Sequence, residues 1–205
     1  MKEYILKRVT SAMSVNDERW EQAEAVRLDF KWNDYFPSPY VTEAKAVHCA
    51  HGITVLLTTT EWPVRASVTE MNGMVCKDSC MEFFFIPNTE DGKYMNFEIN
   101  PIGVLHLGYG EGRHGRELLE FESKGVRLNT LVTPGEGWRA MIHIPYSFLN
   151  EYYSSCDKKM RANFYKCGDE TVEKHFSVWN PVELPKPDYH RPEFFGSLVL
   201  SDEEI

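Results

Sequence analysis

The stretch Trp138-Arg-Ala-Met-Ile-His-Ile144 has the clearest strand pattern in the chain. Every second residue from Trp138 to Ile144 is apolar and is expected to face a core, whereas Arg139, Met141 and His143 face the other side. Such period-2 alternation is typical of a β-strand in an antiparallel sheet. The stretch therefore predicts β-structure and gives a starting point from which neighbouring strands can be assigned.

Working outward, two hairpins are expected. Pro134-Gly-Glu-Gly137 forms turns readily, so residues 126–132 should pair with residues 138–144. Upstream, His51-Gly52 separates two β-rich runs, residues 42–50 and 53–60. Further runs of the same kind cover residues 79–86, 93–100, 104–109, 160–166, 174–179 and 197–200. Many short strands separated by turn residues predict an all-β fold, an antiparallel two-sheet β-sandwich of the jelly-roll kind.

Little else in the chain is expected to be regular. Pro145 can open one short helix, Tyr146 to Tyr153, because proline is favoured in the first turn of a helix. Residues 1–40 are expected to form an irregular lead-in that packs on the sandwich. No break in composition divides the 205 residues, so a single domain over residues 1–205 is predicted.

The amino-acid composition argues against two classes of binding partner. A hydrophobic fraction of 42% and an aromatic fraction of 13% suffice for a core, and no apolar run approaches the roughly 20 residues that span a bilayer. The net charge of −9 gives no basic field for a phosphate backbone. Membrane and nucleic acid are therefore not expected as partners, and the oligomeric state is left open.

The 5 cysteines cannot all pair with one another and are interpreted as free thiols in a reducing compartment. The N-terminal residues 1–15 lack the continuous apolar segment of a signal peptide. These features predict a cytoplasmic protein. It would be a secreted one if a leader had been removed.

Catalytic motifs do not emerge. The chain has no nucleophile elbow, no His-Glu-x-x-His and no phosphate-binding loop, and the glycine-rich residues 108–115 are interpreted as a flexible hairpin loop. Glu82 and Glu98 have the residue types of an acid and base pair. Carboxyl groups that bind a polar ligand explain the same pattern, so no enzyme activity is predicted.

The sequence also contains no clear motif for binding a metal or a cofactor. Cys76-x-x-x-Cys80 with His48 and His51 does not have zinc spacing and is interpreted as ordinary thiols, so no metal and no cofactor are predicted. One alternative is haem held by a methionine and a histidine, for example Met74 or Met95 with His106. No loop has a clear set of oxygen ligands for calcium.

One predicted sheet face is both polar and bordered by aromatic residues. Alternation places Glu82 and Phe84 on one side of the strand at residues 79–86, and Asn96 and Glu98 on the corresponding side of the next strand. Amide and carboxyl groups beside aromatic rings suit the hydroxyls and C–H faces of a sugar. An ordinary solvated sheet face is the alternative.

The order of several motifs resembles carbohydrate-binding module family 9 and its family-9-like relatives across roughly residues 20 to 200. The matching segments are residues 79–86, 94–103, 138–145, 161–165, 176–181, 189–196 and 197–200. The resemblance implies a non-catalytic β-sandwich that clamps the end of a sugar chain between two aromatic rings. Calcium occurs in some relatives, and haem-binding domains of the DOMON type share the sandwich.

The resemblance places one clamp ring at Tyr189, seven residues before Gly196. The second ring is expected about six residues before the strand of Glu82, where residues 74–78 contain no aromatic side chain. Trp62 could supply a ring from another direction. The two-ring clamp therefore looks incomplete.

These observations together predict a saccharide-binding protein without catalytic activity. Its candidate ligand-binding residues are Tyr189, Glu82, Asn96, Glu98, Tyr165, Trp179, Arg191 and Trp62. Two alternatives stay open, a haem-binding DOMON-type sandwich and a protein-interaction module that has lost sugar binding.

Overall fold

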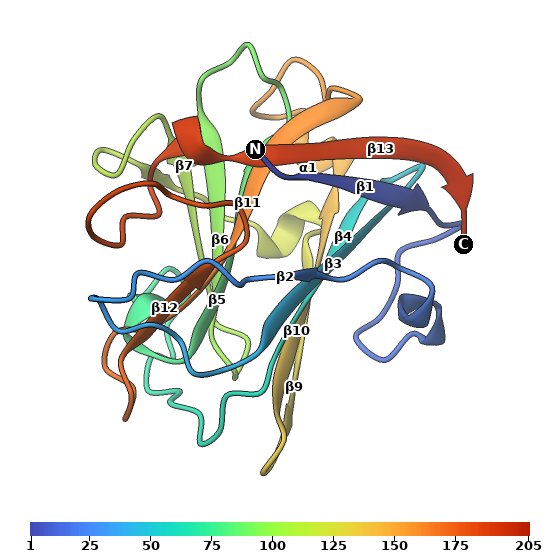
Figure 1. Cartoon of the computed structure of the whole chain (residues 1–205). Coiled ribbons are helices and arrows are strands. Elements are labelled where there is room, and N and C mark those ends of the chain that lie inside the picture. Colours follow the sequence, from blue (N-terminus) through green and yellow to red (C-terminus); the bar gives the residue numbers. More distant parts are fainter.

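The computed structural model describes residues 1–205 and shows a nearly all-β chain (Figure 1). Its strands are β1 (Glu3–Arg8), β2 (Val26–Arg27), β3 (Thr42–Cys49), β4 (Gly52–Thr59), β5 (Cys80–Ile86), β6 (Tyr94–Ile99), β7 (Leu105–Gly110), β8 (Glu117–Leu118), β9 (Arg127–Thr133), β10 (Gly137–Pro145), β11 (Lys159–Gly168), β12 (His175–Val178) and β13 (Gly196–Glu204). The helices are α1 (Tyr146–Leu149) and the 3-10 helices η1 to η4, at Glu18–Glu21, Val75–Lys77, Glu122–Lys124 and Pro192–Phe194. None of them has the length and hydropathy of a membrane-spanning helix. The prediction of a nearly all-β chain with little helix is confirmed.

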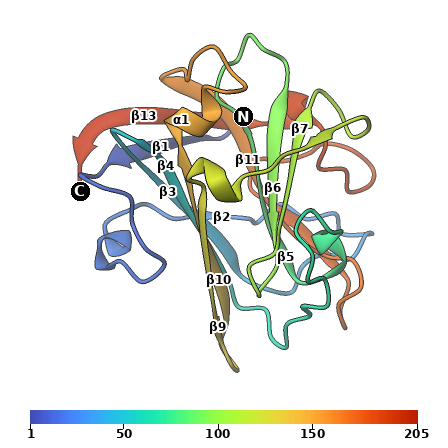
Figure 2. The same ribbon diagram turned by 180° about the vertical axis from the view of Figure 1, so that it is seen from behind.

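Hydrogen bonds join all strands into one continuous sheet, so the predicted division into two sheets is not confirmed. The strand order is β8-β7-β6-β5-β11-β13-β1-β3-β4-β10-β9, with β12 beside β11 and β2 beside β3. The two ends of the chain connect the halves, because β1 pairs in parallel with both β13 and β3. Figures 1 and 2 show β13 and β1 running across one end of the remaining strands. These parallel pairs also correct the expectation of purely antiparallel pairing.

The two halves of this curled sheet enclose the main hydrophobic core. Every second residue of β10 from Trp138 to Ile144 belongs to it, as the alternation predicts. On β5, Met81, Phe83 and Phe85 belong to the same core. Phe83 stacks on Phe164 of β11 with ring centroids 5.2 Å apart. Since one face of β5 and β11 packs inward, their remaining side chains point to the outer face of the sheet.

Both predicted hairpins are present. Cys49 of β3 pairs with Gly52 of β4, and Thr133 of β9 pairs with Gly137 of β10. Gly137 has a φ of 134°, which favours glycine, and a Cβ there would lie 2.0 Å from the carbonyl oxygen of Thr59. Glycine at this position therefore lets the β9–β10 turn approach β4 closely.

The predicted helix begins at Tyr146 after Pro145 but ends at Leu149 instead of Tyr153. The next residues turn back on the helix, because the amide N–H groups of Tyr152 and Tyr153 donate to the carbonyl oxygen of Leu149. The segment is thus one helical turn followed by further turns.

Residues 1–40 are more regular than predicted, because β1 is a full member of the sheet. Tyr4 and Leu6 of β1 are buried in the main core, while the apolar Ile5 between them is exposed and hides the alternation in the sequence. The segment that follows packs on the outer face of β3, β4 and β10 through a smaller apolar cluster that includes Trp20. The segment thus packs on the sheet, and β1 is a regular strand where an irregular lead-in was expected.

The outer face of β5, β6 and β11 lies under the chain that connects β12 to β13. Phe84 of β5 and Val182 of the connection belong to a second apolar cluster there. Consequently Glu82, Asn96 and Glu98 are only 2%, 0% and 8% exposed. The alternative of an ordinary solvated sheet face is wrong, since these polar groups lie beneath a covering segment.

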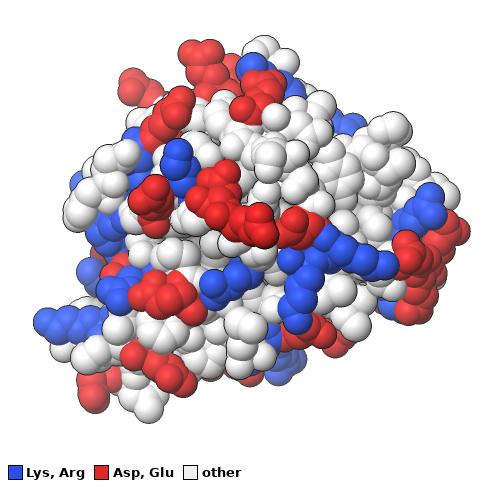
Figure 3. All heavy atoms as spheres, turned by 90° about the horizontal axis from the view of Figure 1, so that it is seen from above, with Lys and Arg blue, Asp and Glu red and all other residues white.

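Exposed charges of both signs lie side by side on the face drawn in Figure 3. Exposed ion pairs include Lys159–Glu3 at 2.8 Å, which joins β11 to β1 across β13, and Lys158–Asp202 at 3.2 Å. Exposed pairs of this kind contribute about 0 to 1 kcal/mol each. The stability of the sheet therefore comes mainly from the apolar clusters.

Candidate functional site

Strand register brings distant titratable residues into one row on the outer face of the sheet. Glu98 of β6 lies opposite Glu82 of β5, and His106 of β7 lies opposite Glu98. On the other side, Tyr165 of β11 lies opposite Glu82. Directly opposed residues have Cβ atoms about 4.5 to 5.5 Å apart, so side chains in this row are in contact range.

A cavity of about 370 Å³ opens above this row. Its acidic lining consists of Glu82, Glu98 and Asp169, and its basic or imidazole lining of Arg113, His106 and His190; the remaining walls are Met74, Cys76, Cys167, Phe176, Pro187 and Tyr189. The size falls within the range of about 300 to 1,000 Å³ of small-molecule sites. A small polar ligand is therefore the occupant that this volume and lining suit.

The two carboxyl groups on the cavity floor have no counter-charge. The Cys167 thiol donates to Glu82 Oε1 at 3.0 Å, and Asn96 Nδ2 donates to Glu98 Oε1 at 2.8 Å. Neither carboxyl forms an ion pair with a lysine, arginine or histidine. Burial, and then the negative charge of Glu98, hold the pKa of Glu82 well above its usual range.

Burial also raises the pKa of Glu98, although His106 works in the opposite direction. A carboxyl group that keeps its proton presents both an O–H donor and an acceptor oxygen. The floor of the cavity can thus exchange hydrogen bonds in both directions with a ligand's hydroxyl groups.

Tyr189 forms a fixed aromatic wall. Its ring stacks on Tyr165 with centroids 4.2 Å apart, and its hydroxyl donates to the carbonyl oxygen of Lys166 at 2.8 Å. The Tyr165 hydroxyl donates to the carbonyl oxygen of Tyr189 at 3.1 Å. Tyr165 is fully buried behind this wall, so it supports Tyr189 and does not itself line the cavity.

Asn96 lies beside the cavity and positions Glu98. The Arg116 Nε donates to Asn96 Oδ1 at 2.8 Å, which leaves the Asn96 amide group to donate to Glu98. Arg116 in turn lies over the Tyr94 ring, 4.0 Å from its centroid. Gly108 of β7 makes room for this contact, because a Cβ there would lie 2.6 Å from Asn96 Oδ1.

Three further predicted site residues lie away from the cavity. Trp179 lies in the main core between Tyr4 and Phe164, with ring centroids 6.5 and 5.5 Å away. Arg191 lies outside and forms ion pairs with Asp188 and Glu193. Trp62 is 40% exposed on the loop before β5 and is absent from the lining. The structure thus brings together Glu82, Glu98 and Tyr189, with Asn96 and Tyr165 behind them.

Two residues of the haem alternative face opposite sides of the sheet. Met95 is buried in the main core, whereas His106 lines the cavity and its Nδ1 lies 2.9 Å from the carbonyl oxygen of Asn72. Met95 and His106 therefore cannot hold one ligand between them. Met74 does line the cavity together with His106.

Several cavity residues were not anticipated from sequence. Cys167 reaches Glu82 only because β11 pairs with β5, and His190 and Arg113 arrive on separate loops. The Tyr94 hydroxyl lies 2.7 Å from His190 Nδ1, and burial, then Arg113, lower the pKa of His190 to about 3. No local motif marks these residues, because they come from segments far from Glu82 in the sequence.

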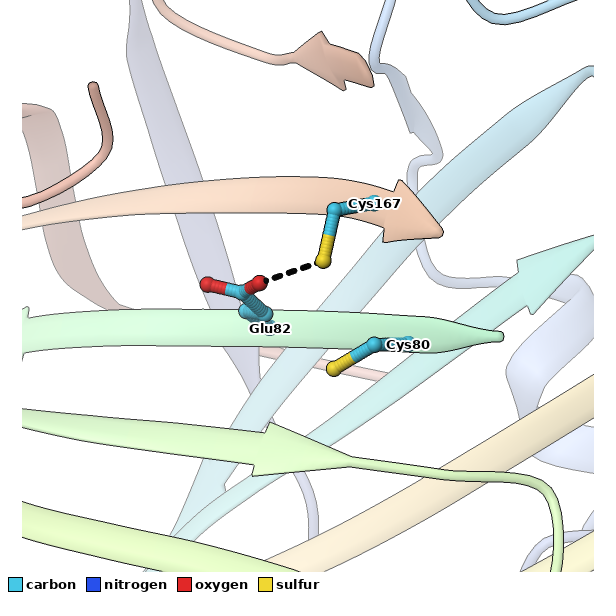
Figure 4. A group of neighbouring side chains, drawn as sticks. All are labelled: Cys80, Glu82 and Cys167. Atoms are coloured by element: carbon cyan, nitrogen blue, oxygen red, sulfur yellow. Dashed lines mark hydrogen bonds between the residues drawn. The ribbon is translucent and has the colours of Figure 1, made fainter. Parts of the chain in front are cut away.

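Two buried thiols lie next to Glu82. Cys80 and Glu82 share one face of β5, and Cys167 lies opposite Cys80 on β11 (Figure 4). Burial raises the pKa of the Cys80 thiol to about 12. The contact with Cys80, together with burial, raises the pKa of Cys167 well above its usual range. Both sulfurs are therefore thiols at neutral pH in the absence of a metal ion.

The fold and the cavity together define a class, a β-sheet domain that binds a polar ligand on the outer face of its sheet. Comparison with protein families sharpens this class, since residues 9–200 match the model of carbohydrate-binding family 9. The chain belongs to this family. The resemblance inferred from the motif order is thereby confirmed.

Solved structures with the same fold agree with this assignment. A protein from Bacteroides uniformis, provisionally assigned as carbohydrate-binding, is 30% identical with a TM-score of 0.84, and the match covers 98% of this chain and 99% of that one. A family 9 module from Caldicellulosiruptor kristjanssonii in complex with cellotriose is 11% identical with a TM-score of 0.69, covering 99% and 95%. The same organism's module in complex with glucose has a TM-score of 0.67 at 11% identity, covering 99% and 97%. A comparison with curated proteins found no match.

Proposed function

We propose that the chain is a non-catalytic binding domain that holds the end of a saccharide, or a free mono- or disaccharide, in the cavity above Glu82 and Glu98. The observation that carries the proposal is the combination, in a family 9 chain, of a hydrogen-bonding floor with one fixed aromatic wall, Tyr189. Relatives in this family have structures with cellotriose and glucose. Their ligands support the same chemical class here.

The chemistry of the lining fits a sugar. Glu82, Glu98 and Asp169 offer oxygen acceptors, and Arg113 adds a guanidinium donor at the edge. The apolar C–H face of a pyranose ring can lie against Tyr189. A sugar ring has polar hydroxyl edges and apolar C–H faces. The carboxyl groups and Arg113 match the edges, and the ring of Tyr189 matches a face.

A second aromatic wall is missing. Residues 74–78, where the family resemblance expects the other ring, contribute Met74 and Cys76 to the cavity. An aromatic pair adds about 0.5 to 1.5 kcal/mol beyond its area burial, so one ring less predicts weak binding. We expect dissociation constants in the millimolar range, which correspond to about −4 kcal/mol.

The carboxyl pair supports binding better than hydrolysis. An acid and a nucleophile need environments that push their pKa values apart, and the environments of Glu82 and Glu98 raise both pKa values. Both groups also lie side by side on neighbouring strands of one floor. We therefore expect no turnover of aryl glycosides by the purified chain, and turnover that disappears in Glu82→Gln would contradict this part of the proposal.

The proposal is tested by titrating the chain with glucose, xylose, galactose and cellobiose, followed by calorimetry or NMR shifts, in buffer containing a chelator. Glu82→Gln and Glu98→Gln are expected to weaken binding about two- to tenfold, since a lost hydrogen bond costs about 0.5 to 1.5 kcal/mol. Glu193→Gln, outside the cavity, is the matched control and should bind normally. Binding that ignores both cavity variants would move the site elsewhere, and no binding of any saccharide would reject the function.

A further inference from the structure

Three potential metal ligands meet at the floor of the cavity. Cys80 and Glu82 project from the same face of β5, two residues apart, and Cys167 projects toward them from β11 (Figure 4). One sulfur from each cysteine and one carboxyl oxygen of Glu82 all lie within 4.8 Å of one another. All three side chains are buried. They lie on paired strands, so the pairing of β5 with β11 fixes their relative positions.

The carboxyl groups beside this metal-ligand group form no ion pair, although basic side chains stand elsewhere around the cavity. Glu98 lies opposite Glu82, and neither forms an ion pair. Lys166, the neighbour of Cys167 on β11, has its Nζ 2.8 Å from Glu61 and forms no ion pair with Glu82. Buried carboxylates are usually paired with a cation or coordinate a metal. A bound cation would give an ionised Glu82 the partner that it otherwise lacks.

We propose that Cys80, Cys167 and Glu82 bind one zinc ion at the floor of the cavity. Two sulfur ligands favour a thiophilic cation such as Zn²⁺ and disfavour calcium, which takes oxygen ligands. Zinc sites with three protein ligands keep a fourth position open. Here that position faces the cavity, because Cys167 and Glu82 both line it.

Coordination requires only small side-chain movements. Zinc–sulfur bonds of about 2.3 Å and zinc–oxygen bonds of about 2.0 Å place tetrahedral ligands roughly 3.5 to 3.8 Å apart. The present Cys167 Sγ to Glu82 Oε1 distance is already 3.0 Å. Binding releases the two thiol protons, and the Glu82 proton when it is present, so the affinity should fall as the pH is lowered.

The test uses the full chain, reduced and freed of metal with a chelator, and titrates it with Co²⁺ as a spectroscopic probe and then with Zn²⁺. We expect one equivalent of Co²⁺ to produce a sulfur-to-metal charge-transfer band that Zn²⁺ abolishes. Cys80→Ser and Cys167→Ser should each weaken binding by at least about 100-fold, since even partners outside the coordination shell cost about 10- to 100-fold. Cys49→Ser and Cys156→Ser, which lie outside the group, are matched controls and should bind normally.

Wild-type chain that shows no charge-transfer band with millimolar Co²⁺ would overturn the proposal, and this result does not depend on the folding of any variant. Tight binding that survives either Cys80→Ser or Cys167→Ser, in variants whose circular dichroism matches the wild type, would overturn it as well. Because metal is titrated without sugar, and sugar is titrated with a chelator, this proposal and the saccharide proposal can fail separately.

Discussion

Lys166 and Cys167 are neighbours on β11, yet they enter two buried polar regions that differ in one respect. Lys166 Nζ lies 2.8 Å from Glu61 and 2.7 Å from His175 Nε2, so a buried carboxylate there has its counter-charge. Cys167 points to the other face, where Glu82 lies beside Glu98 with no counter-charge. We call the first the paired region and the second the open region.

This difference distinguishes a region with a structural role from a region that can bind a ligand. In the paired region, Ser79 Oγ also donates to Glu61 at 2.7 Å and Trp138 Nε1 donates at 3.2 Å, so both carboxylate oxygens of Glu61 have partners. Burial alone would raise the pKa of Glu61, but Lys166, together with Ser79 and His175, lowers it. In the open region, the carboxyl groups of Glu82 and Glu98 can form further hydrogen bonds, and they face a cavity. Unmet capacity beside a cavity indicates a binding site, whereas satisfied capacity indicates a structural role.

The largest expected effect is the loss of the counter-charge in the paired region. Lys166→Met leaves Glu61 buried and unpaired, which should lower the free energy of unfolding by about 3 to 5 kcal/mol. Urea denaturation measures this loss. Lys158→Met, which removes an exposed pair, is the control and should change it by less than about 1 kcal/mol.

Combining Lys166→Met with Glu61→Gln should recover part of the loss, because the unpaired charge is removed as well. A Lys166→Met variant as stable as the wild type would break the comparison, since it would show that Glu61 does not need its partner.

The next effect is an opposite dependence of stability on pH in the two regions. Burial, then the charge of Lys166, lower the pKa of His175 from 6.5 to about 4. Between these values the unfolded chain binds a proton that the folded chain does not, so the free energy of unfolding falls as the pH falls. One pKa unit corresponds to about 1.4 kcal/mol, so the loss approaches roughly 3 kcal/mol near pH 4.

The raised pKa values of Glu82 and Glu98 have the reverse sign. Their contribution to stability is fully present below the ordinary pKa of 4.5 and is lost as the pH rises through the raised values. Denaturation from pH 4 to 9 should therefore show a shallower acid slope in His175→Gln and a flatter alkaline slope in Glu82→Gln/Glu98→Gln. Variants with the slopes of the wild type would contradict the assignment of these groups.

The sequence predicts most strands but not their long-range partners. Alternation located the inward face of β10 and put Glu82, Asn96 and Glu98 on one side of β5 and β6. It missed β1, where an exposed isoleucine between Tyr4 and Leu6 obscures the alternation. Pairing of β1 with β13 depends on contacts between the two ends of the chain, which no local pattern specifies.

The candidate site follows the same rule: its local features could be predicted from the sequence, and its long-range contacts could not. Strand faces are a local property, so the acidic floor was found from alternation, and Tyr189 followed from the family resemblance. Cys167 and His190 come from segments far away in sequence, so a single sequence could not place them beside Glu82. Trp179 was misplaced because an aromatic residue next to a polar motif can pack inward as easily as line a cavity.

A smaller effect is expected for the stability of the open region. Glu82→Gln removes a buried carboxyl that has no counter-charge, so at pH 8 the chain should be as stable as the wild type or up to about 1 kcal/mol more stable. Urea denaturation at pH 8 measures this change in the free energy of unfolding, with Glu117→Gln as an exposed control. A loss of more than about 2 kcal/mol would mean that Glu82 is structural, and the two regions would no longer differ in kind.

The smallest effect comes from adding an aromatic ring to the open region. Met74 lies on the cavity wall and is 62% exposed, so Met74→Tyr has space for a ring and should leave the free energy of unfolding within about 0.5 kcal/mol. A ring on this wall stands where the family resemblance expects the second clamp residue. An aromatic contact of about 0.5 to 1.5 kcal/mol corresponds to roughly two- to tenfold tighter saccharide binding. Met71→Tyr, also exposed but outside the cavity, is the matched control for an added surface ring. Equal affinities for Met74→Tyr and the control would show that the ligand does not lie between Tyr189 and Met74, and the site would then be confined to the carboxyl floor.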